Sequence, residues 1–380
     1  MRAFDCFDEI IESNFEANPK RMARIGLPKS LVSRNGNRSD KTLRIGFVPL
    51  IDCAPIILAH ETGLYREYGL EIALMREPGW ATIRDKMAYG ELDAAHAPVG
   101  LAFALNWGLG VLPQPCLTGY LLNSNADAIS VSRELYESGV TDPDTLAVET
   151  RNSHRERPLT FGVPHQFSTH HFHLLQWMRP AGIIPGRDIQ IVVLPPSLMP
   201  SCLAAGDIDG FCVGEPFNTL AAEKGNGVIL AQHSDLSLMH PEKALLAAGS
   251  FEDAKHDQHI ELIRATAEAA RRLETHEGRA AAVDILSQPH YLGLNSKLIE
   301  SSLSASESEA DGAGSNKRLL IFSHPEVNRP TNDKGNWLLS HMRNAGLLEG
   351  VNTKAGPLLS DIFREDLFEE ATVKDYKVSA

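Results

Sequence analysis

The chain has 380 residues, which is enough for two lobes of ordinary domain size, and 43% of the residues are hydrophobic, which supports buried cores. Its net charge of −13 at pH 7 argues against direct nucleic-acid binding, because that function needs a basic face. No apolar run reaches the length of a membrane-spanning helix, so we expect no insertion into a membrane.

The first 41 residues are expected to form an N-terminal extension. This region carries Asp5, Asp8, Glu9 and Glu12 and lacks the long apolar segment of a secretory signal. The five cysteines of the chain are scattered, and no CxxC pair suggests zinc. These features favour a protein of a reducing compartment, and we expect a cytoplasmic location.

A first α/β unit begins at Thr42. Residues 43–59, LRIGFVPLIDCAPIILA, predict a strand, a loop and the start of a helix, with Asp52 or Cys53 facing a ligand cleft. A second strand is expected at 71–75. A strand–helix–strand unit of this length predicts a parallel pair joined by a right-handed crossover.

One pattern occurs twice, at 80–98 (WATIRDKMAYGELDAAHAP) and at 194–218 (LPPSLMPSCLAAGDIDGFCVGEPFN). Each stretch predicts a short helix, a glycine turn and a buried apolar strand. Open α/β sheets bind ligands at the carboxyl ends of such strands, so the two copies predict two similar lobes that share a cleft. The alternative is that both are ordinary helix–strand turns, in which Gly-acid-aliphatic-Asp is common.

The second unit opens with a strand at 159–163, and Ser168-Thr169-His170 begins the helix that follows. A strand at 208–213 ends in Gly214-Glu215-Pro216. Residues 240–243, His-Pro-Glu-Lys, precede an apolar run that is typical of a strand returning to the first unit.

Three further segments are expected after this return. An amphipathic helix is predicted at 257–273, because apolar residues repeat at helical spacing. A mobile loop rich in Ser, Glu, Gly and Ala is predicted at 301–315. A last helix is predicted at 337–348.

The order and spacing of these motifs resemble the nitrate- and bicarbonate-binding solute receptors of ABC transporters. The motifs that carry the resemblance are WATIRDKMAYGELDAAH, FGVPHQFSTH, LPPSLM, GDIDGFCVGEPFN and HPEKAL. The resemblance implies an α/β fold of the two-lobed type II periplasmic-binding-protein class, with a ligand cleft between the lobes. On this fold, lobe 1 consists of residues 42–127 and 244–350, lobe 2 of residues 128–243, and the C-terminal tail of residues 351–380.

The resemblance assigns ligand contact to the positions of Trp80, His170, Pro196, Val213, Gly214 and Lys243. Helix N-termini at Trp80 and Thr169 would present free N–H groups and a positive dipole end to an anion. We expect Thr169 to add a hydroxyl group, His170 a charged hydrogen bond and Lys243 a cation that faces a wet cleft. Trp80 offers an indole N–H and a flat wall, and the other three positions would shape an apolar floor.

Asp127 departs from the receptor pattern, in which a glutamine supplies an amide donor at this position. An ionised carboxylate accepts hydrogen bonds and donates none, and it would repel a neighbouring anion. We therefore expect Asp127 to pair with Lys243 or His170, or to leave the donor role to a neighbour such as Asn125. Lys243 still favours nitrate or nitrite, since the bicarbonate receptors are expected to use a carboxylate and a calcium ion in this region.

A cluster of histidines, His165, His170, His171 and His173, invites a metal interpretation. Only His170 and His173 share a helical face, and no carboxylate or cysteine accompanies them, so we expect no metal site. Glu215 is expected to be a loop-end carboxylate satisfied by backbone donors rather than a catalytic acid. No nucleophile is paired with a base, and we expect no catalytic residue and no cofactor.

The segments IGFVPLIDCAPIILA and REPGWATIRDK are most similar to the cytoplasmic branch of the family, the nitrate/nitrite sensors. The resemblance implies a sensor that binds nitrate or nitrite and controls an RNA-binding antiterminator response regulator of nitrate assimilation genes. One alternative is the nitrate-binding subunit of an ABC transporter. A second is an enzyme similar to the thiamine-pyrimidine synthases, which share the fold class, although their CCCFC segment does not occur in this chain.

Overall fold

The computed structural model describes residues 41–125, 127–151, 157–232, 240–304, 320–353 and 356–376. The expected N-terminal extension falls outside the described residues, apart from residue 41, and so does most of the loop expected at 301–315.

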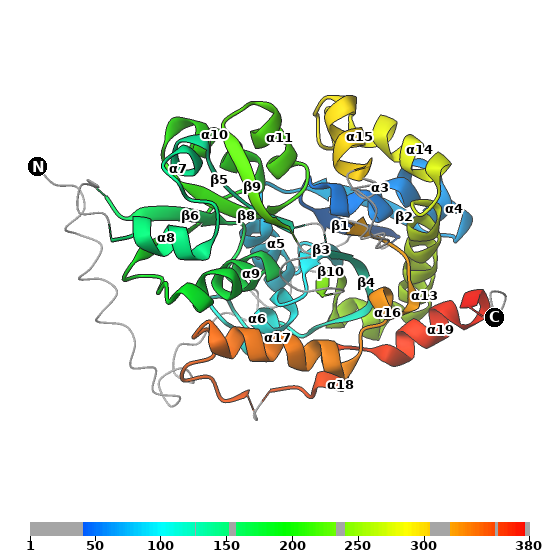
Figure 1. Cartoon of the computed structure of the whole chain (residues 1–380). Coiled ribbons are helices and arrows are strands. Elements are labelled where there is room, and N and C mark those ends of the chain that lie inside the picture. Colours follow the sequence, from blue (N-terminus) through cyan, green and yellow to red (C-terminus); the bar gives the residue numbers. More distant parts are fainter. Residues whose placement is uncertain are drawn as a thin grey trace, which may run out of the picture. The chain divides into compact units, whose positions relative to one another are not determined.

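The first sheet contains six strands within the described residues, in the order β11-β4-β10-β3-β1-β2 (Figure 1). The bounds are Thr42–Phe47 for β1, Glu71–Arg76 for β2, Ala94–Pro98 for β3, Cys116–Asn125 for β4, Pro241–Ala248 for β10 and Leu320–Ile321 for β11. β1 pairs in parallel with β2, which confirms the parallel pair predicted from the sequence. β10 runs antiparallel between β3 and β4, so the apolar run after Lys243 does return to this sheet.

The second sheet contains five strands within the described residues, in the order β7-β6-β8-β5-β9. The bounds are Asp127–Ser132 for β5, Leu159–Val163 for β6, Ile189–Val193 for β7, Gly210–Gly214 for β8 and Gly227–Gln232 for β9. β8 begins two residues later than the predicted strand at 208–213, because the N–H groups of Asp207 and Ile208 are directed to the carbonyl of Cys202 in the preceding turn. We refer to the two sheets with their helices as lobe 1 and lobe 2, and the exact lobe boundaries stay a prediction.

The described helices have the bounds Ala54–Glu61 for α3, Leu64–Glu67 for α4, Trp80–Ala88 for α5, Leu101–Trp107 for α6, Arg133–Glu137 for α7, Pro143–Glu149 for α8, Thr169–Met178 for α9, Met199–Ala205 for α10, Phe217–Glu223 for α11, Gly249–Arg272 for α13, His276–Leu286 for α14, Ser296–Ser304 for α15, Pro325–Asn328 for α16, Asn332–Asn344 for α17, Leu359–Ile362 for α18 and Glu365–Tyr376 for α19. The predicted helix at 257–273 is the main part of α13, which begins earlier and kinks at Lys255. α17 begins before the predicted 337, because the Thr331 side chain caps it by accepting a hydrogen bond from the Lys334 N–H. None of the described helices has the length and apolar character needed to span a membrane.

The chain passes between the two sheets twice in the part that the structure describes. The first crossing joins β4 to β5, and Asn125 ends β4 with a φ of 69°, a left-handed conformation that asparagine tolerates. The second crossing ends at His240, directly before β10, where Ser124 Oγ donates a hydrogen bond to the His240 carbonyl at 2.6 Å. Ser124 and His240 therefore lie side by side, and His240 Nε2 comes within 3.5 Å of Asp127 Oδ1.

The two lobes are packed together through apolar contacts. The hydrophobic core of lobe 1 extends without a break to Phe167, Phe211 and Val213 of lobe 2. A Cβ atom on Gly100 would lie 2.3 Å from the Phe167 carbonyl oxygen, so this close approach of the two lobes requires glycine. The two lobes are therefore in direct apolar contact around the buried polar residues that are described next.

Candidate functional site

Trp80, His170 and Lys243 lie together where the lobes meet. Trp80 begins α5 in lobe 1, and its ring stacks on the ring of His170, which comes from the first turn of α9 in lobe 2, with centroids 6.0 Å apart. Lys243 Nζ, on β10, lies 5.0 Å from the centre of the Trp80 ring, a distance that suits a cation–π contact. The sequence motifs therefore converge in space.

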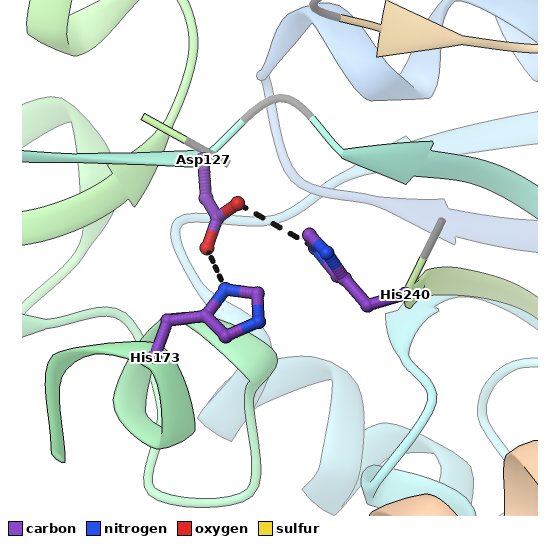
Figure 2. Close-up of side chains that lie close together, drawn as sticks. All are labelled: Asp127, His173 and His240. Atoms are coloured by element: carbon purple, nitrogen blue, oxygen red, sulfur yellow. Dashed lines mark hydrogen bonds and ion pairs between the residues drawn. The ribbon is translucent and has the colours of Figure 1, made fainter. Parts of the chain in front are cut away.

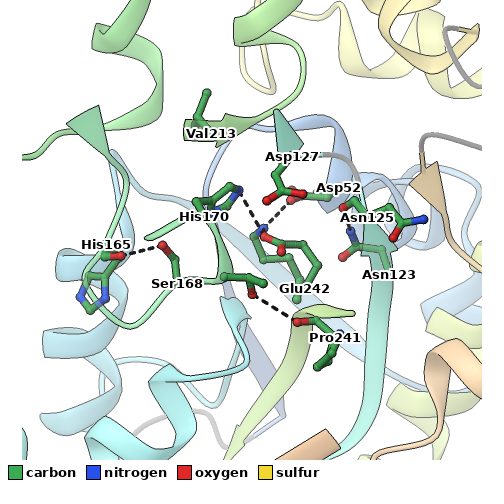
Figure 3. Close-up of polar contacts among 12 residues, drawn as sticks. Asp52, Asn123, Asn125, Asp127, His165, Ser168, His170, Val213, Pro241 and Glu242 are labelled. Atoms are coloured by element: carbon green, nitrogen blue, oxygen red, sulfur yellow. Dashed lines mark hydrogen bonds and ion pairs between the residues drawn. The ribbon is translucent and has the colours of Figure 1, made fainter. Parts of the chain in front are cut away.

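The other predicted positions surround these three. A Cβ on Gly214 would lie 3.4 Å from His170 Nε2 and 3.6 Å from Asp52 Oδ2, so Gly214 faces the polar centre. Thr169 Oγ1 donates a hydrogen bond to the Pro241 carbonyl at 3.2 Å and thereby joins α9 to β10. Val213 is buried on β8 (Figure 3), and Pro196 is buried at the start of the short 3-10 helix Pro196–Leu198.

Lys243 is completely buried, so the expectation that it faces a wet cleft is wrong. Its Nζ atom lies 2.8 Å from Asp52 Oδ2 and 2.5 Å from Glu242 Oε1. Burial alone would lower the pKa of Lys243, but Asp52 and Glu242 outweigh burial and raise the pKa. The lysine is therefore a charged group whose charge is already balanced by two carboxylates.

Asp52 occupies the position foreseen for a residue facing the cleft. Its Oδ1 atom lies 2.9 Å from His96 Nε2, and its pKa falls to about 2 because Lys243 and then His96 outweigh the effect of burial. Cys53, the alternative named from the sequence, instead donates its thiol to the Leu50 carbonyl at 2.8 Å. Asp52, and not Cys53, is thus part of the polar centre.

Glu242 and His96 were missed as site residues, although both lie in motifs that carry the resemblance. Glu242 contacts Lys243, its neighbour in sequence, whereas consecutive side chains on a regular strand point to opposite faces. The pairing of β10 with β4 shifts register on both sides of Lys243, and such a bulge re-aims side chains. The sequence carries no visible signal for this bulge.

His170 is buried, and its pKa falls to about 4, because burial outweighs the opposing effect of Glu242. The imidazole is therefore neutral at pH 7, and the expected charged hydrogen bond from His170 is wrong. The Trp80 indole N–H is also committed, since it donates to the His96 carbonyl at 3.2 Å. Trp80 offers its flat face to the site, but its N–H donor points elsewhere.

Asp127 pairs with neither of its expected partners, Lys243 and His170. Its Oδ2 atom lies 2.5 Å from Nδ1 of His173, and its Oδ1 atom lies 3.5 Å from Nε2 of His240 (Figure 2). The argument that no carboxylate accompanies the histidines is therefore wrong, because a residue from the first crossing reaches them. Burial would raise the pKa of Asp127, but His173 and His240 hold it below its usual range.

The position of Glu215 agrees with the expectation of a loop-end carboxylate that accepts hydrogen bonds from backbone donors. It is buried at the end of β8, and its Oε2 atom accepts a hydrogen bond from the backbone N–H of Thr219 at 3.1 Å. Its backbone carbonyl accepts a hydrogen bond from the Ile51 N–H at 3.0 Å, which joins the two lobes. This carboxylate serves the loop and contacts none of the described side chains of the polar centre.

Two sheets joined by two crossings, with buried polar side chains of both lobes meeting at the junction, define a two-lobed α/β protein of the type II periplasmic-binding-protein class. The fold is similar to that of the periplasmic nitrate-binding protein NrtA from Synechocystis PCC 6803, with a TM-score of 0.80, 23% identity and 90% of each chain covered. The chain belongs to the NMT1-like family, whose family model matches residues 36–287.

Known relatives are named as components of anion transport. The nitrate import ATP-binding protein NrtC of Synechocystis is 31% identical over 93% of this chain and 53% of its own length. The nitrate/nitrite binding protein NrtA of Synechococcus elongatus is 29% identical over 87% of this chain and 77% of its own length. The chain thus spans about half the length of the NrtC relative. The desulfurization enzyme DSZB shares the fold at 12% identity, with a TM-score of 0.56, so the fold alone does not distinguish a receptor from an enzyme.

Proposed function

We propose that this chain binds nitrate or nitrite at the interlobe centre formed by Trp80, His170 and Lys243, and that it works as a receptor rather than an enzyme. One observation carries the proposal. Lys243 Nζ and His170 Nε2 converge on a single oxygen, Glu242 Oε1, at 2.5 and 3.2 Å. Two nitrogen groups that meet at one carboxylate oxygen mark a position suited to an oxyanion, and the Trp80 ring lies beside Lys243 at this position.

The anion reaches this position by replacing the Glu242 carboxylate. Glu242 Oε2 lies 3.2 Å from His240 Nε2, so the side chain has an alternative partner when Oε1 leaves Lys243. Burial by itself would raise the pKa of Glu242, but the Lys243 ammonium holds it low, so the residue is an anion that competes with the ligand. The names of the NrtA relatives support nitrate and nitrite as the ligands to test first.

The further step of the proposal is that the protein is a cytoplasmic sensor that holds an RNA-binding antiterminator response regulator of nitrate assimilation genes. The net charge of −13 suits a partner that is basic where it meets RNA. A partner that contacts both lobes in the anion-free state binds less well once the anion has changed the interface. By linkage, the partner and the anion weaken each other by the same factor.

The alternative is a transport receptor that delivers the anion to an ABC transporter. The names of the relatives favour it, since NrtC is an import component and NrtA a binding protein. Both alternatives require anion binding, and they differ only in the partner. An enzyme of the same fold is the third candidate, and consumption of a substrate by the purified chain would support it.

Two measurements test the proposal. Isothermal titration with nitrate, nitrite, bicarbonate and chloride determines whether the first two bind and the others do not. Size-exclusion chromatography of the chain mixed with the antiterminator then determines the partner, and we expect a complex that nitrate or nitrite dissociates. Anion binding without such a complex would favour the transport receptor, and no anion binding would overturn both. Fractionation of the native host cell tests the proposed cytoplasmic location.

A further inference from the structure

Asp127, His173 and His240 form a second cluster beside the anion position. They come from three elements: Asp127 from the start of β5, His173 from α9 and His240 from the segment before β10 (Figure 2). All three side chains are buried, with 0%, 0% and 2% of their surface exposed. One ligand atom from each residue lies within 4.8 Å of the others.

The donor atoms of this cluster have the chemistry and spacing of a metal site. A tetrahedral ion about 2.1 Å from each donor keeps the donors roughly 3.4 Å apart. The Asp127 carboxylate lies 2.5 Å from His173 Nδ1 and 3.5 Å from His240 Nε2, so small side-chain rotations reach that geometry. Glu242 Oε2, 3.2 Å from His240 Nε2, is the nearest carboxylate for a fourth position.

A buried oxygen in the cluster points to an ion as its partner. Asp127 Oδ1 is completely buried and makes no hydrogen bond to any residue that the structure describes, and His240 Nε2 faces it at the long distance of 3.5 Å. An ionised oxygen buried in this way is costly unless a cation or donor meets it. Within the described residues, the ion-pair partners of Asp127 are the two imidazoles of His173 and His240, and no ammonium or guanidinium group pairs with it.

Aromatic packing holds the two imidazoles in place. The ring of Trp337, on α17, stacks on His240 with centroids 6.3 Å apart and meets His173 edge-on at 6.2 Å. We propose that Asp127, His173 and His240 bind one zinc(II) ion, which joins the two interlobe crossings to α9.

Zinc is the choice because two imidazoles and one carboxylate suit a borderline divalent transition ion, whereas calcium and magnesium prefer oxygen donors alone. Cys212 is the nearest soft donor, with Sγ 4.0 Å from Asp127 Oδ2. Cys212 does not belong to the group of residues whose ligand atoms all lie within 4.8 Å of one another, so it is not counted as a ligand. The proposed role of the ion is structural, because it would connect segments of both lobes.

The test uses the full chain, freed of metal with a chelator and then dialysed. Isothermal titration with zinc chloride should give one ion per chain, and cobalt(II) chloride should give the intense visible absorption of a four-coordinate site. His173→Gln removes one ligand at similar volume and should weaken zinc binding by more than about 100-fold, since even indirect metal contacts are worth 10- to 100-fold. His276→Gln, at an exposed position, is the matched control and should leave zinc binding unchanged.

A second cluster of acidic and histidine residues could bind zinc instead, and the experiment distinguishes the two sites. Glu252, His256 and His259 on α13 also lie together, with Glu252 oxygens 2.8 and 2.5 Å from the two imidazoles. Zinc binding that His259→Gln abolishes and His173→Gln does not would overturn the proposal, and so would a wild-type chain that binds no zinc. If a variant fails to fold, the stoichiometry and the cobalt spectrum of the wild-type chain still decide whether a four-coordinate site exists. The chloride salts keep nitrate out of the experiment, so failure here leaves the proposed anion site untouched.

Discussion

Glu242 and Lys243 are neighbours on β10, and yet their side chains meet in the same buried centre, with Oε1 of Glu242 2.5 Å from Nζ of Lys243. The bulge in the pairing of β10 with β4 makes this possible. As a result, the protein places its own carboxylate where an incoming oxyanion would contact Lys243 and His170. Ligand affinity then depends on how easily that carboxylate leaves.

Glu242→Gln should therefore strengthen nitrate binding. The substitution keeps the size of the side chain and removes a negative charge that competes with the ligand. Two like charges about 4 Å apart repel by about 4 kcal/mol at an effective dielectric constant of 20, so a gain of at least tenfold in affinity is expected. Isothermal titration measures it, with the exposed Glu300→Gln as the control. Equal or weaker binding by a folded Glu242→Gln chain would argue that the anion does not replace this carboxylate.

Lys243→Met should abolish nitrate binding and also destabilise the fold. Removing the lysine leaves Asp52 and Glu242 buried without their cation, and loss of one partner of a buried ion pair costs about 3–5 kcal/mol. Urea unfolding should show this loss, and the double variant Lys243→Met/Asp52→Asn should recover part of it, because a neutral amide replaces one unpaired carboxylate. Lys297→Met, at an exposed position, is the control. If unfolding of Lys243→Met matched that of the wild type, the buried ion pair would have no energetic weight.

Gly214→Ala should weaken nitrate binding through crowding. The added Cβ would lie 3.0 Å from Leu50 Cδ2 and 3.4 Å from His170 Nε2, so the side chains of both lobes must shift. Overpacking of this kind costs about 1–3 kcal/mol, which corresponds to a loss of roughly five- to 150-fold if it is expressed in the anion-bound state. Gly79→Ala is the matched control, since its Cβ would meet its nearest neighbour at an ordinary distance of 4.0 Å. Titration of a Gly214→Ala/Leu50→Ala chain should show partial recovery, and no loss in Gly214→Ala alone would place the anion elsewhere.

The helices and strands were predicted well from the sequence, because the patterns that indicate them extend over only a few neighbouring residues. The glycine that ends α10 and the apolar residues of β8 follow from spacing along a few residues, and Gly206 does end that helix in a left-handed conformation. The partners of Asp127 could not be predicted, since His173 is 46 residues away along the chain and meets it only when α9 packs against β5. Burial of Lys243 also depended on packing between the lobes, which no local pattern records.

The last prediction concerns pH and Glu215, which lies outside the polar centre. Burial raises the pKa of Glu215 from 4.5 to about 7, although Thr219 opposes the shift. The native chain therefore holds the proton more tightly than the unfolded chain. The stability that this proton contributes is fully present below pH 4.5 and is lost as the pH rises through 7.

Glu215→Gln should remove this loss, because an amide cannot ionise and its oxygen can still accept the hydrogen bond from the Thr219 N–H. Relative to the wild type, the variant should gain stability between pH 5 and pH 8.5, by up to roughly 3 kcal/mol for a shift of this size. Urea unfolding of both chains across this range measures the difference, and using the difference removes the contribution of the other titrating groups. Glu300→Gln, whose side chain is exposed, should give a pH profile parallel to that of the wild type. If Glu215→Gln also ran parallel, Glu215 would be ionised in the native chain throughout, and the loop that joins β8 to α11 would have to admit water to its carboxylate.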